Sequence, residues 1–303
     1  MNWLNSFELI CYIIVALLLV NLVRHKDYNS LFTFGAAALV GFFMELAAVA
    51  VTDIYYYNQG FWLNLGSEPK QFPLFGGLMW GGLTVCGIKL AEKLNFGKTM
   101  TALAAGMFIV TMDILLDVVA IRLDGGFWTW VGNPISTEIT QSTFLSVIWV
   151  NFLGYMIETP TVVILTQIKS KKVEPRQFGK QTLGMVLIAL VAIIVTAVGS
   201  LTALGLNILT NDWFACTAFT LLWVFMVVDI TIQAFRRGLL PMKPKYWDLS
   251  ITLFWLAMYV YCLVAIINLG FAKDLSWFFI IGLIFMISTI YVAISEPKKV
   301  YRT

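Results

Sequence analysis

Long runs of apolar residues recur along the whole chain and restrict its fold more than any other feature of the sequence. A helix needs about 20 mostly apolar residues to cross the hydrocarbon core of a bilayer. Nine segments of this kind are present, at residues 7–23, 31–53, 74–94, 100–121, 143–168, 182–208, 213–235, 249–270 and 276–295. Only 12% of the 303 residues are charged, about half of the fraction in an average soluble domain. The sequence therefore predicts an all-α fold, a polytopic integral-membrane helical bundle of about nine transmembrane helices, in a single domain spanning residues 1–303.

Basic residues indicate how these segments thread through the membrane. Lys and Arg concentrate in cytoplasmic loops. Here they gather after the first, third, fifth, seventh and ninth segments, as in RHK at 24–26 and KSKKVEPRQFGK at 169–180. This alternation predicts an N-terminus outside and a cytoplasmic C-terminus. The start of the chain, MNWLNSFELI, lacks the basic region of a signal peptide, so we expect the first segment to be retained as a span.

Cysteine, histidine and net charge argue against several other classes of protein. Cys11, Cys86, Cys216 and Cys262 are scattered singly through apolar segments, and His25 is the only histidine in the sequence. No CxxC pair or His–Cys cluster is present, so we expect no disulfide framework, no metal site and no cofactor. The net charge is only +3 and the basic residues lie in a few loops, so we expect a lipid bilayer and not nucleic acid as the surroundings.

Acidic side chains inside the predicted spans are the strongest indication of function. An ionisable group at the middle of a bilayer is costly unless it is paired or hydrated, and it normally faces the interior of the bundle. No Lys or Arg lies in the middle of a span, although Arg122 could reach Asp117 from the outer interface. Several such residues are present: Glu45 and Asp53 in the second segment, Asp113 and Asp117 in the fourth, Glu158 in the fifth and Asp229 in the seventh.

The spacing of these residues predicts that they face common neighbours. Asp113 and Asp117 are four residues apart and therefore lie on one face of a helix. Glu45 and Asp53, eight residues apart, lie within about 80° of each other around the second helix. Two helices thus present four carboxyl groups in the outer half of the predicted bundle.

The fifth segment adds a second polar face. Asn151 and Glu158 are seven residues apart and nearly superposed around the helix. Pro160 follows them and cannot donate a backbone hydrogen bond, so the carbonyl of Met156 is left free. A missing backbone hydrogen bond of this kind is tolerated in a membrane only where the free group faces protein or a cavity.

Unpaired carboxyls in a low-dielectric environment hold their protons near neutral pH and are poised as general acids. We interpret Asp113 and Asp117 as a proton source in an apolar pocket. The alternative is that a buried carboxyl only bonds a neighbouring helix, which is the interpretation we prefer for the isolated Asp229. The aromatics of the long outer loops, 52–75 and 122–142, could form the interfacial belt or line a mouth where their faces stabilise a cation. Those flanking the acidic cluster are Tyr55, Tyr56, Tyr57, Trp62, Trp80, Trp128 and Trp130.

Several of these motifs occur together in one known family. After an acidic residue in the second span, Glu45, the chain carries YYY at 55–57, FPLFGGLMW at 72–80, DILLD at 113–117, GFWTW at 126–130 and VNFLGY at 150–155. This pattern, over roughly residues 40–170, resembles the integral-membrane carotenoid biosynthesis family that includes bisanhydrobacterioruberin hydratase. Family members usually read D-x-x-L-D-P, where this chain has Val118 in place of the proline. The loop before Asn151 also departs from the usual Gly-Val-Pro.

The resemblance implies a function that agrees with the acidic cluster. Characterised members add water across the terminal double bonds of long linear carotenoids, which requires an acid strong enough to protonate an unactivated alkene. By this resemblance Asp113 and Asp117 are the acids, Glu45 holds or recharges the proton, and Asn151 and Glu158 position water. The aromatic and outer residues Asp53, Tyr55, Tyr57, Trp80, Trp128 and Trp130 are expected to contact a hydrophobic isoprenoid or carotenoid substrate in a bacterial or archaeal cell membrane.

Three alternatives remain open from the sequence. An intramembrane isoprenoid cyclase begins with the same protonation but excludes water. A proton-coupled secondary transporter also uses membrane carboxylates, although it normally shows paired repeats and a site near the midplane, and the sequence shows neither. A structural or assembly factor would carry out no catalysis.

Overall fold

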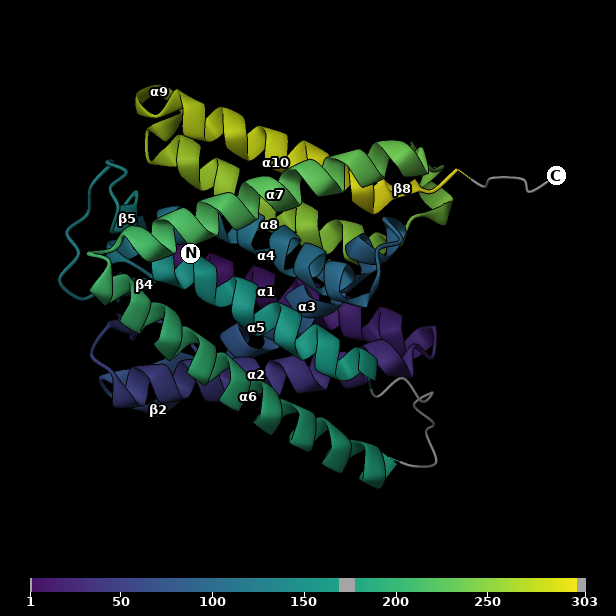
Figure 1. Ribbon diagram of the computed structural model, residues 1–303, viewed down its shortest axis with the longest axis horizontal. Helices are drawn as coiled ribbons and strands as arrows, with labels where there is room; N and C mark the ends of the chain where they lie inside the picture. Colours follow the sequence, from purple (N-terminus) through teal and green to yellow (C-terminus); the bar gives the residue numbers. More distant parts are fainter. Residues whose placement is uncertain (1, 169–177, 299–303) are drawn as a thin grey trace.

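The computed structural model describes residues 2–168 and 178–298, and within them the protein is an all-α, polytopic helical bundle. Each of the nine predicted segments overlaps one long helix over most of its length (Figure 1). These helices are α1 (Trp3–Arg24), α2 (Tyr28–Val51), α3 (Leu74–Lys93), α4 (Lys98–Ala120), α5 (Trp149–Ile168), α6 (Phe178–Leu209), α7 (Trp213–Arg237), α8 (Leu249–Asn268) and α10 (Ser276–Ile294). A short helix, α9 (Phe271–Asp274), lies in the turn between α8 and α10.

Eight of the described helices are long and apolar enough to cross a membrane, which is compatible with an integral membrane protein. The remaining long helix, α5, has 20 residues and is therefore long enough as well. Its sequence includes Asn151, Glu158 and Pro160. The predicted fifth segment began too early, because residues 143–148 form the short strands β5 (Thr143–Phe144) and β6 (Val147–Ile148) before α5 starts.

Helix α4 forms the centre of the bundle. It packs against α3, α5 and α8, and 94% of the residues in its most apolar 18-residue stretch are buried. In α6 and α7 only 17% of the residues in such a stretch are buried. Figure 1 shows these two helices diverging along the outside of the bundle. A helix that is apolar on all sides yet mostly exposed is suited to contact with lipid. The acidic helix α4 is therefore the one most completely surrounded by protein.

Short strands form a cap over one end of the bundle, where α1 and α3 begin and α2 and α4 end (Figure 1). Strand β1 (Tyr55–Tyr57) pairs antiparallel with β4 (Trp128–Trp130), and β2 (Asn64–Ser67) pairs with β3 (Lys70–Pro73). A 3₁₀ turn, η1 (Leu123–Gly125), connects α4 to β4. The two aromatic outer loops, which are about 70 residues apart in the sequence, are thus joined as one ribbon.

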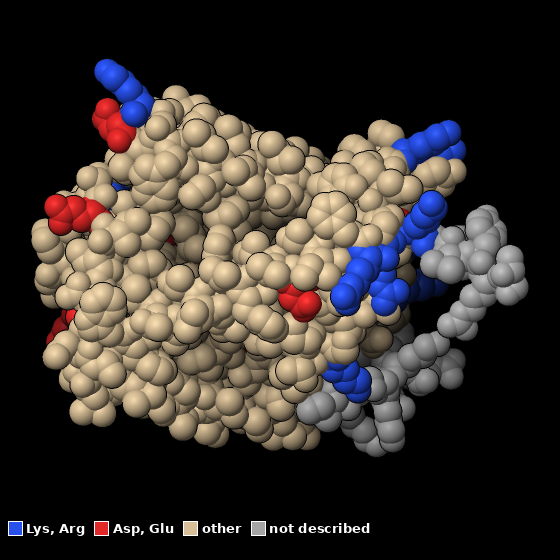
Figure 2. Space-filling view, turned by 45° about the horizontal axis from the view of Figure 1, so that its top comes forward, with Lys and Arg blue, Asp and Glu red and all other residues tan. Residues whose placement is uncertain are grey.

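The opposite end of the bundle carries most of the visible basic side chains, as Figure 2 shows. Here the chain between α7 and α8 forms β7 (Leu240–Pro241) and the 3₁₀ turn η3 (Pro244–Tyr246). Strand β7 pairs with β8 (Ser295–Glu296), which directly follows α10. Helix α1 begins at the cap, whereas α10 ends at this opposite end of the bundle.

Candidate functional site

The predicted catalytic carboxyl groups come together beneath the cap, from three different helices. Asp113 and Asp117 lie on α4, Glu45 on α2 and Glu158 on α5. The exposed fractions of Asp113, Asp117 and Glu158 are 3%, 2% and 8%, whereas Glu45 is half-buried. Glu45 lies close enough to interact electrostatically with each of the other three. The sequence predicted Glu45, Asp113 and Asp117 in the outer half of the bundle, and the packing of α2, α4 and α5 brings them together with Glu158.

The two aspartates of α4 form the buried centre of this cluster. Their i, i+4 spacing brings the carboxyl groups within side-chain hydrogen-bonding range of each other. Asn151 Nδ2 of α5 donates to Asp117 Oδ2. Tyr155, one helical turn further along α5, lies within reach of Asp113. Among the described residues, the buried Asp113 Oδ2 has no hydrogen-bond partner, so this oxygen is available to a bound molecule.

Glu45 is held from above by the aromatic ribbon. The hydroxyl of Tyr55 donates to Glu45 Oε2, and the hydroxyl of Tyr57 donates to the same oxygen at 3.0 Å. Burial and the nearby Glu45 carboxylate both raise the pKa of the two tyrosines well above its usual value, so both hydroxyls remain donors at neutral pH. The carboxyl is therefore fixed by two neutral donors and not by a cation.

The aromatic side chains of the two outer loops form a roof over Glu45. Tyr55 lies opposite Trp130 with ring centroids 5.0 Å apart, and Tyr57 lies opposite Trp128 at 5.9 Å. Directly opposite residues of an antiparallel pair share one face of the ribbon. Of these four rings, Tyr57 and Trp128 line the cavity beneath them.

A cavity of about 70 Å³ lies between the roof and the carboxyls. Its polar walls are Glu45, Asp113, Tyr57 and Tyr155, and its apolar walls include Trp80. A buried water needs about 10–15 Å³ measured in this way, so the cavity has room for a few water molecules. The site thus combines carboxyl groups, hydroxyl groups and aromatic faces around one small space.

Tyr155 is a site residue that the sequence analysis did not single out. Its ring stacks on Trp80 with centroids 4.9 Å apart and an angle of 22° between the planes. It lines the cavity and reaches Asp113 from α5. The available signal was its position four residues after Asn151, which places both on one face of the helix.

Glu158 lies deeper, beside the proline of α5. Its Oε1 is buried and has no hydrogen-bond partner among the described residues. On α4, a Cβ atom at Gly106 would lie 3.3 Å from Pro160 Cδ, so the two helices approach closely at this point. The proline therefore faces protein, as expected for a break inside a span.

Asp53 does not belong to the cluster, contrary to the prediction. Helix α2 ends at Val51, so Asp53 lies beyond it and not inside the span. Its side chain is 90% exposed and forms an ion pair with Lys70 at 3.1 Å. An exposed pair of this kind contributes little to stability. Two of the flanking aromatics, Tyr56 and Trp62, are also substantially exposed and lie outside the roof.

Arg122 does not pair with Asp117 either. It donates to the backbone carbonyls of Val118, Ser136 and Leu145, which ties the loop before α5 to the end of α4. Asp229, for which we preferred a structural role, lies half-buried on the outer helix α7.

Glu8 of α1 is a further buried carboxyl that the sequence analysis passed over. It accepts hydrogen bonds from the backbone N–H groups of Trp62 and Leu63 at 2.7 and 3.1 Å and from Tyr12. It was recognisable as an acidic residue inside an apolar segment. Because its partners are mainly backbone groups of the cap, Glu8 holds the cap in place.

Comparison of the chain with protein-family models, with curated proteins and with solved structures gives no match. Within residues 2–168 and 178–298, no three His, Cys, Asp or Glu side chains converge in a way that could hold a metal ion. What the site can do follows from its own geometry. It can hold water and a small hydrophobic group next to buried carboxyl groups.

Proposed function

We propose that the protein is a membrane-embedded, acid-catalysed isoprenoid-modifying enzyme, and specifically a hydratase that adds water to a terminal C=C bond of a long polyene. The observation that supports this most directly is the cavity in which Asp113 and Glu45 face aromatic rings. The resemblance of residues 40–170 to the carotenoid hydratase family points to the same chemistry. No step of this reaction requires a cofactor.

In the proposed reaction the Asp113 carboxyl transfers its proton to the terminal double bond, which leaves a tertiary carbocation on the neighbouring carbon. A water molecule in the cavity adds its oxygen to that carbon and then returns a proton to the carboxylate. The net change is the addition of one water to one alkene, and the acid is regenerated. Asp113 is the better proton donor because it lines the cavity, whereas Asp117 lies behind it and is bonded to Asn151.

The groups around the cavity suit both steps of this reaction, the formation of the carbocation and the addition of water. The stacked rings of Trp80 and Tyr155 offer an aromatic surface to the cation, an interaction of about 0.5–2 kcal/mol. Glu45 and Tyr57, on the side of the cavity under the roof, are suited to orient the water. An enzyme that captured the cation by an internal double bond would need the acid but no group to orient water, so Glu45 and Tyr57 support hydration over cyclisation.

The size of the cavity favours a reaction at the end of a long molecule. Its volume of about 70 Å³ is far below the roughly 300–1,000 Å³ of a pocket that encloses a whole ligand. Only the terminal group of a polyene would enter, while the rest of the chain would lie among the helices or in the lipid. We further propose that the cap faces the outside of a bacterial or archaeal cell membrane, because basic residues gather at the opposite end, as Figure 2 shows.

The test is expression in cells that make a linear polyene such as lycopene, followed by mass spectrometry of the lipid extract. We expect a mass gain of one or two waters that is lost in Asp113→Asn and strongly reduced in Asp117→Asn. The matched control is Asp274→Asn, a change of the same kind at an exposed position in α9. Both site variants must still insert and elute as folded protein.

Each other outcome has a definite meaning. An unchanged mass with a shifted retention time and absorption spectrum would assign the site to a cyclase. Full activity in both aspartate variants would remove the proposed acid. An unchanged extract would contradict hydration of this polyene, and proton-coupled uptake into proteoliposomes would then test the transporter alternative.

A further inference from the structure

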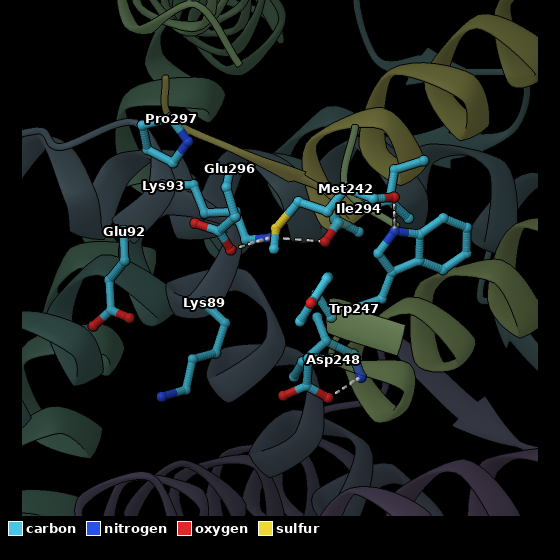
Figure 3. A pocket seen from close by; sticks show the side chains of 12 residues that line it. Lys89, Glu92, Lys93, Met242, Trp247, Asp248, Ile294, Glu296 and Pro297 are labelled. Carbon is cyan, nitrogen blue, oxygen red and sulfur yellow. Dashed lines mark hydrogen bonds and ion pairs between the residues drawn. The ribbon is translucent and has the colours of Figure 1, made fainter. Parts of the chain in front are cut away.

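A second cavity, of about 370 Å³, lies at the end of the bundle away from the cap (Figure 3). It is lined by the end of α3, the start of α8 and the end of α10, with residues 242–248 along one side. Along α3, the residues that line the first cavity end at Leu83 and those that line the second begin at Lys89, six residues or about 9 Å further along the helix. Its volume falls within the range of ligand pockets. This cavity is therefore distinct from the proposed catalytic site.

Lys93 forms a fixed wall of this cavity. Its Nζ donates to the carbonyls of Ala293 and Ser295 at 2.7 and 2.9 Å, and Glu296 Oε1 lies 3.5 Å away. These carbonyls belong to the last turn of α10 and to the strand that follows, where a cation is favourable. The three hydrogens of this ammonium group are thus directed at protein oxygens, and Lys93 is not a free binding group.

Lys89, in contrast, keeps donors available. Among the described residues, its hydrogen-bond partner is Asp27 Oδ2 at 2.8 Å. An ammonium group carries three N–H donors, so two remain for a ligand. In Figure 3 its side chain extends along the cavity between Glu92 and Asp248.

Two carboxylates of the cavity also keep free acceptor capacity. Asp248 Oδ1 caps α8 by accepting from the N–H groups of Ser250 and Ile251, whereas Oδ2 contacts only Asn21, at 3.4 Å, among the described residues. Glu296 places Oε1 toward Lys93, and the described residues supply no partner to its other oxygen. These are two negatively charged groups with unused lone pairs beside one cavity.

Trp247 adds an aromatic face to the wall of this cavity. The indole Nε1 of Trp247 donates to the carbonyl of Met242 at 2.6 Å, which fixes the ring at the wall (Figure 3). An indole face attracts an ammonium group. The charged side chains that line the cavity are Lys89, Lys93, Glu92, Asp248 and Glu296, two positive against three negative. The cavity therefore disfavours a simple anion and suits a ligand that carries a cation together with a single anionic group.

We propose that this cavity binds a phosphate–ammonium zwitterion, such as the head group of a phosphatidylethanolamine lipid. The ammonium group lies against Asp248, Glu296 and the indole of Trp247. The phosphate accepts from Lys89. The position of the cavity at the end of the long apolar helices places it at the depth of lipid head groups. The proposal does not depend on the chemistry assigned to the first cavity.

The test uses the full-length protein, purified and delipidated in detergent, with native mass spectrometry of bound molecules. The probes are short-chain phosphatidylethanolamine, the corresponding phosphatidylglycerol, soluble phosphoethanolamine and inorganic phosphate. We expect phosphatidylethanolamine to bind at least about tenfold more tightly than phosphatidylglycerol, because the latter brings an anion without the ammonium group.

Two substitutions remove charge without removing the local structure. Asp248→Asn keeps a good helix N-cap, and Glu296→Gln keeps an oxygen acceptor. Each is expected to weaken phosphatidylethanolamine binding roughly tenfold, the loss of one charge-assisted hydrogen bond. Asp274→Asn, at the cap end, is the matched control and should leave binding unchanged.

The outcomes distinguish a lipid ligand from a soluble one and show which results would overturn the proposal. Binding of the lipid without measurable binding of soluble phosphoethanolamine identifies a membrane lipid, and equal binding of both identifies a soluble zwitterion; each supports the site. Equal or tighter binding of phosphatidylglycerol or inorganic phosphate would overturn it. Undiminished binding in both Asp248→Asn and Glu296→Gln would also overturn it, whatever the polyene assay shows.

Discussion

Replacing Arg122 by methionine tests how the cap positions the acidic cluster. Arg122 donates to the carbonyl of Val118 in α4 and to two carbonyls of the loop before α5, at Ser136 and Leu145. Its guanidinium also lies 5.3 Å from the ring centroid of Phe271. Burial lowers the pKa of Arg122 to about 10, so the group remains charged at neutral pH and depends on these carbonyls for compensation.

The expected loss follows from these contacts. A hydrogen bond from a charged donor contributes about 1.5–3 kcal/mol, so the two bonds to the loop set an upper limit of roughly 3–6 kcal/mol. Water replaces part of this at a half-buried position, and we expect about 2–4 kcal/mol. The loop also contains two successive non-glycine residues with positive φ, Leu145 at 49° and Ser146 at 72°. Without Arg122 this strained backbone is free to relax.

The consequence for function comes through α5. Because the loop leads directly into α5, its relaxation would shift Asn151 away from Asp117 and reduce product formation at least tenfold. Unfolding in an SDS titration measures the stability, and chromatography of the lipid extract measures the product. Arg122→Lys should lose about half as much stability, because lysine lacks the planar fork, and Lys273→Met is the exposed control. A change of less than about 0.5 kcal/mol in Arg122→Met would refute the reasoning.

Three further substitutions test other contacts. Tyr57→Phe removes the hydroxyl that donates to Glu45 at 3.0 Å but keeps the ring; we expect product formation to fall roughly tenfold with little change in Tm, and normal turnover would contradict the role of that hydroxyl. Gly41→Ala places a Cβ atom 2.4 Å from Trp80 Cδ1; we expect a loss of about 1–3 kcal/mol in unfolding free energy and a displaced indole, with partial recovery when Trp80→Phe is added. Lys93→Met leaves two carbonyls at the end of α10 without their donor; we expect destabilisation of about 1–3 kcal/mol in the same titration, and an unchanged midpoint would show that water replaces the lysine.

The positions of the helices were predictable because burial in lipid imposes one simple requirement on each segment. The predicted segment 74–94 and the observed α3, Leu74–Lys93, agree within one residue, and α7 begins at the predicted Trp213. The prediction of the fifth segment was wrong at its start, because residues 143–148 are apolar enough to continue a span but form a strand pair. Hydropathy alone does not distinguish a buried strand from a buried helix in so short a run.

The site was predictable in part. The i, i+4 spacing of Asp113 and Asp117 follows from helix geometry, and their shared environment was inferred correctly. Asp53 was misplaced because the end of a helix is uncertain by a few residues, and Asp53 lies two residues beyond it. Tyr155 was overlooked because a tyrosine in an apolar segment is usually packing, and only its stacking on Trp80 beside Asp113 distinguishes it.

The sequence by itself thus determined that the chain is a bundle of long apolar helices and that carboxyl groups lie within them, since length, hydropathy and helical spacing are local properties. The tertiary structure decided which carboxyls meet, that Tyr55 and Tyr57 hold Glu45 from the β1–β4 ribbon, and that Arg122 binds loop carbonyls and not Asp117. These contacts join residues that range from 10 positions apart in the chain, Tyr55 and Glu45, to more than 100, Glu45 and Glu158. Their partners are chosen by how helices and loops pack, and no local pattern in the sequence specifies that packing.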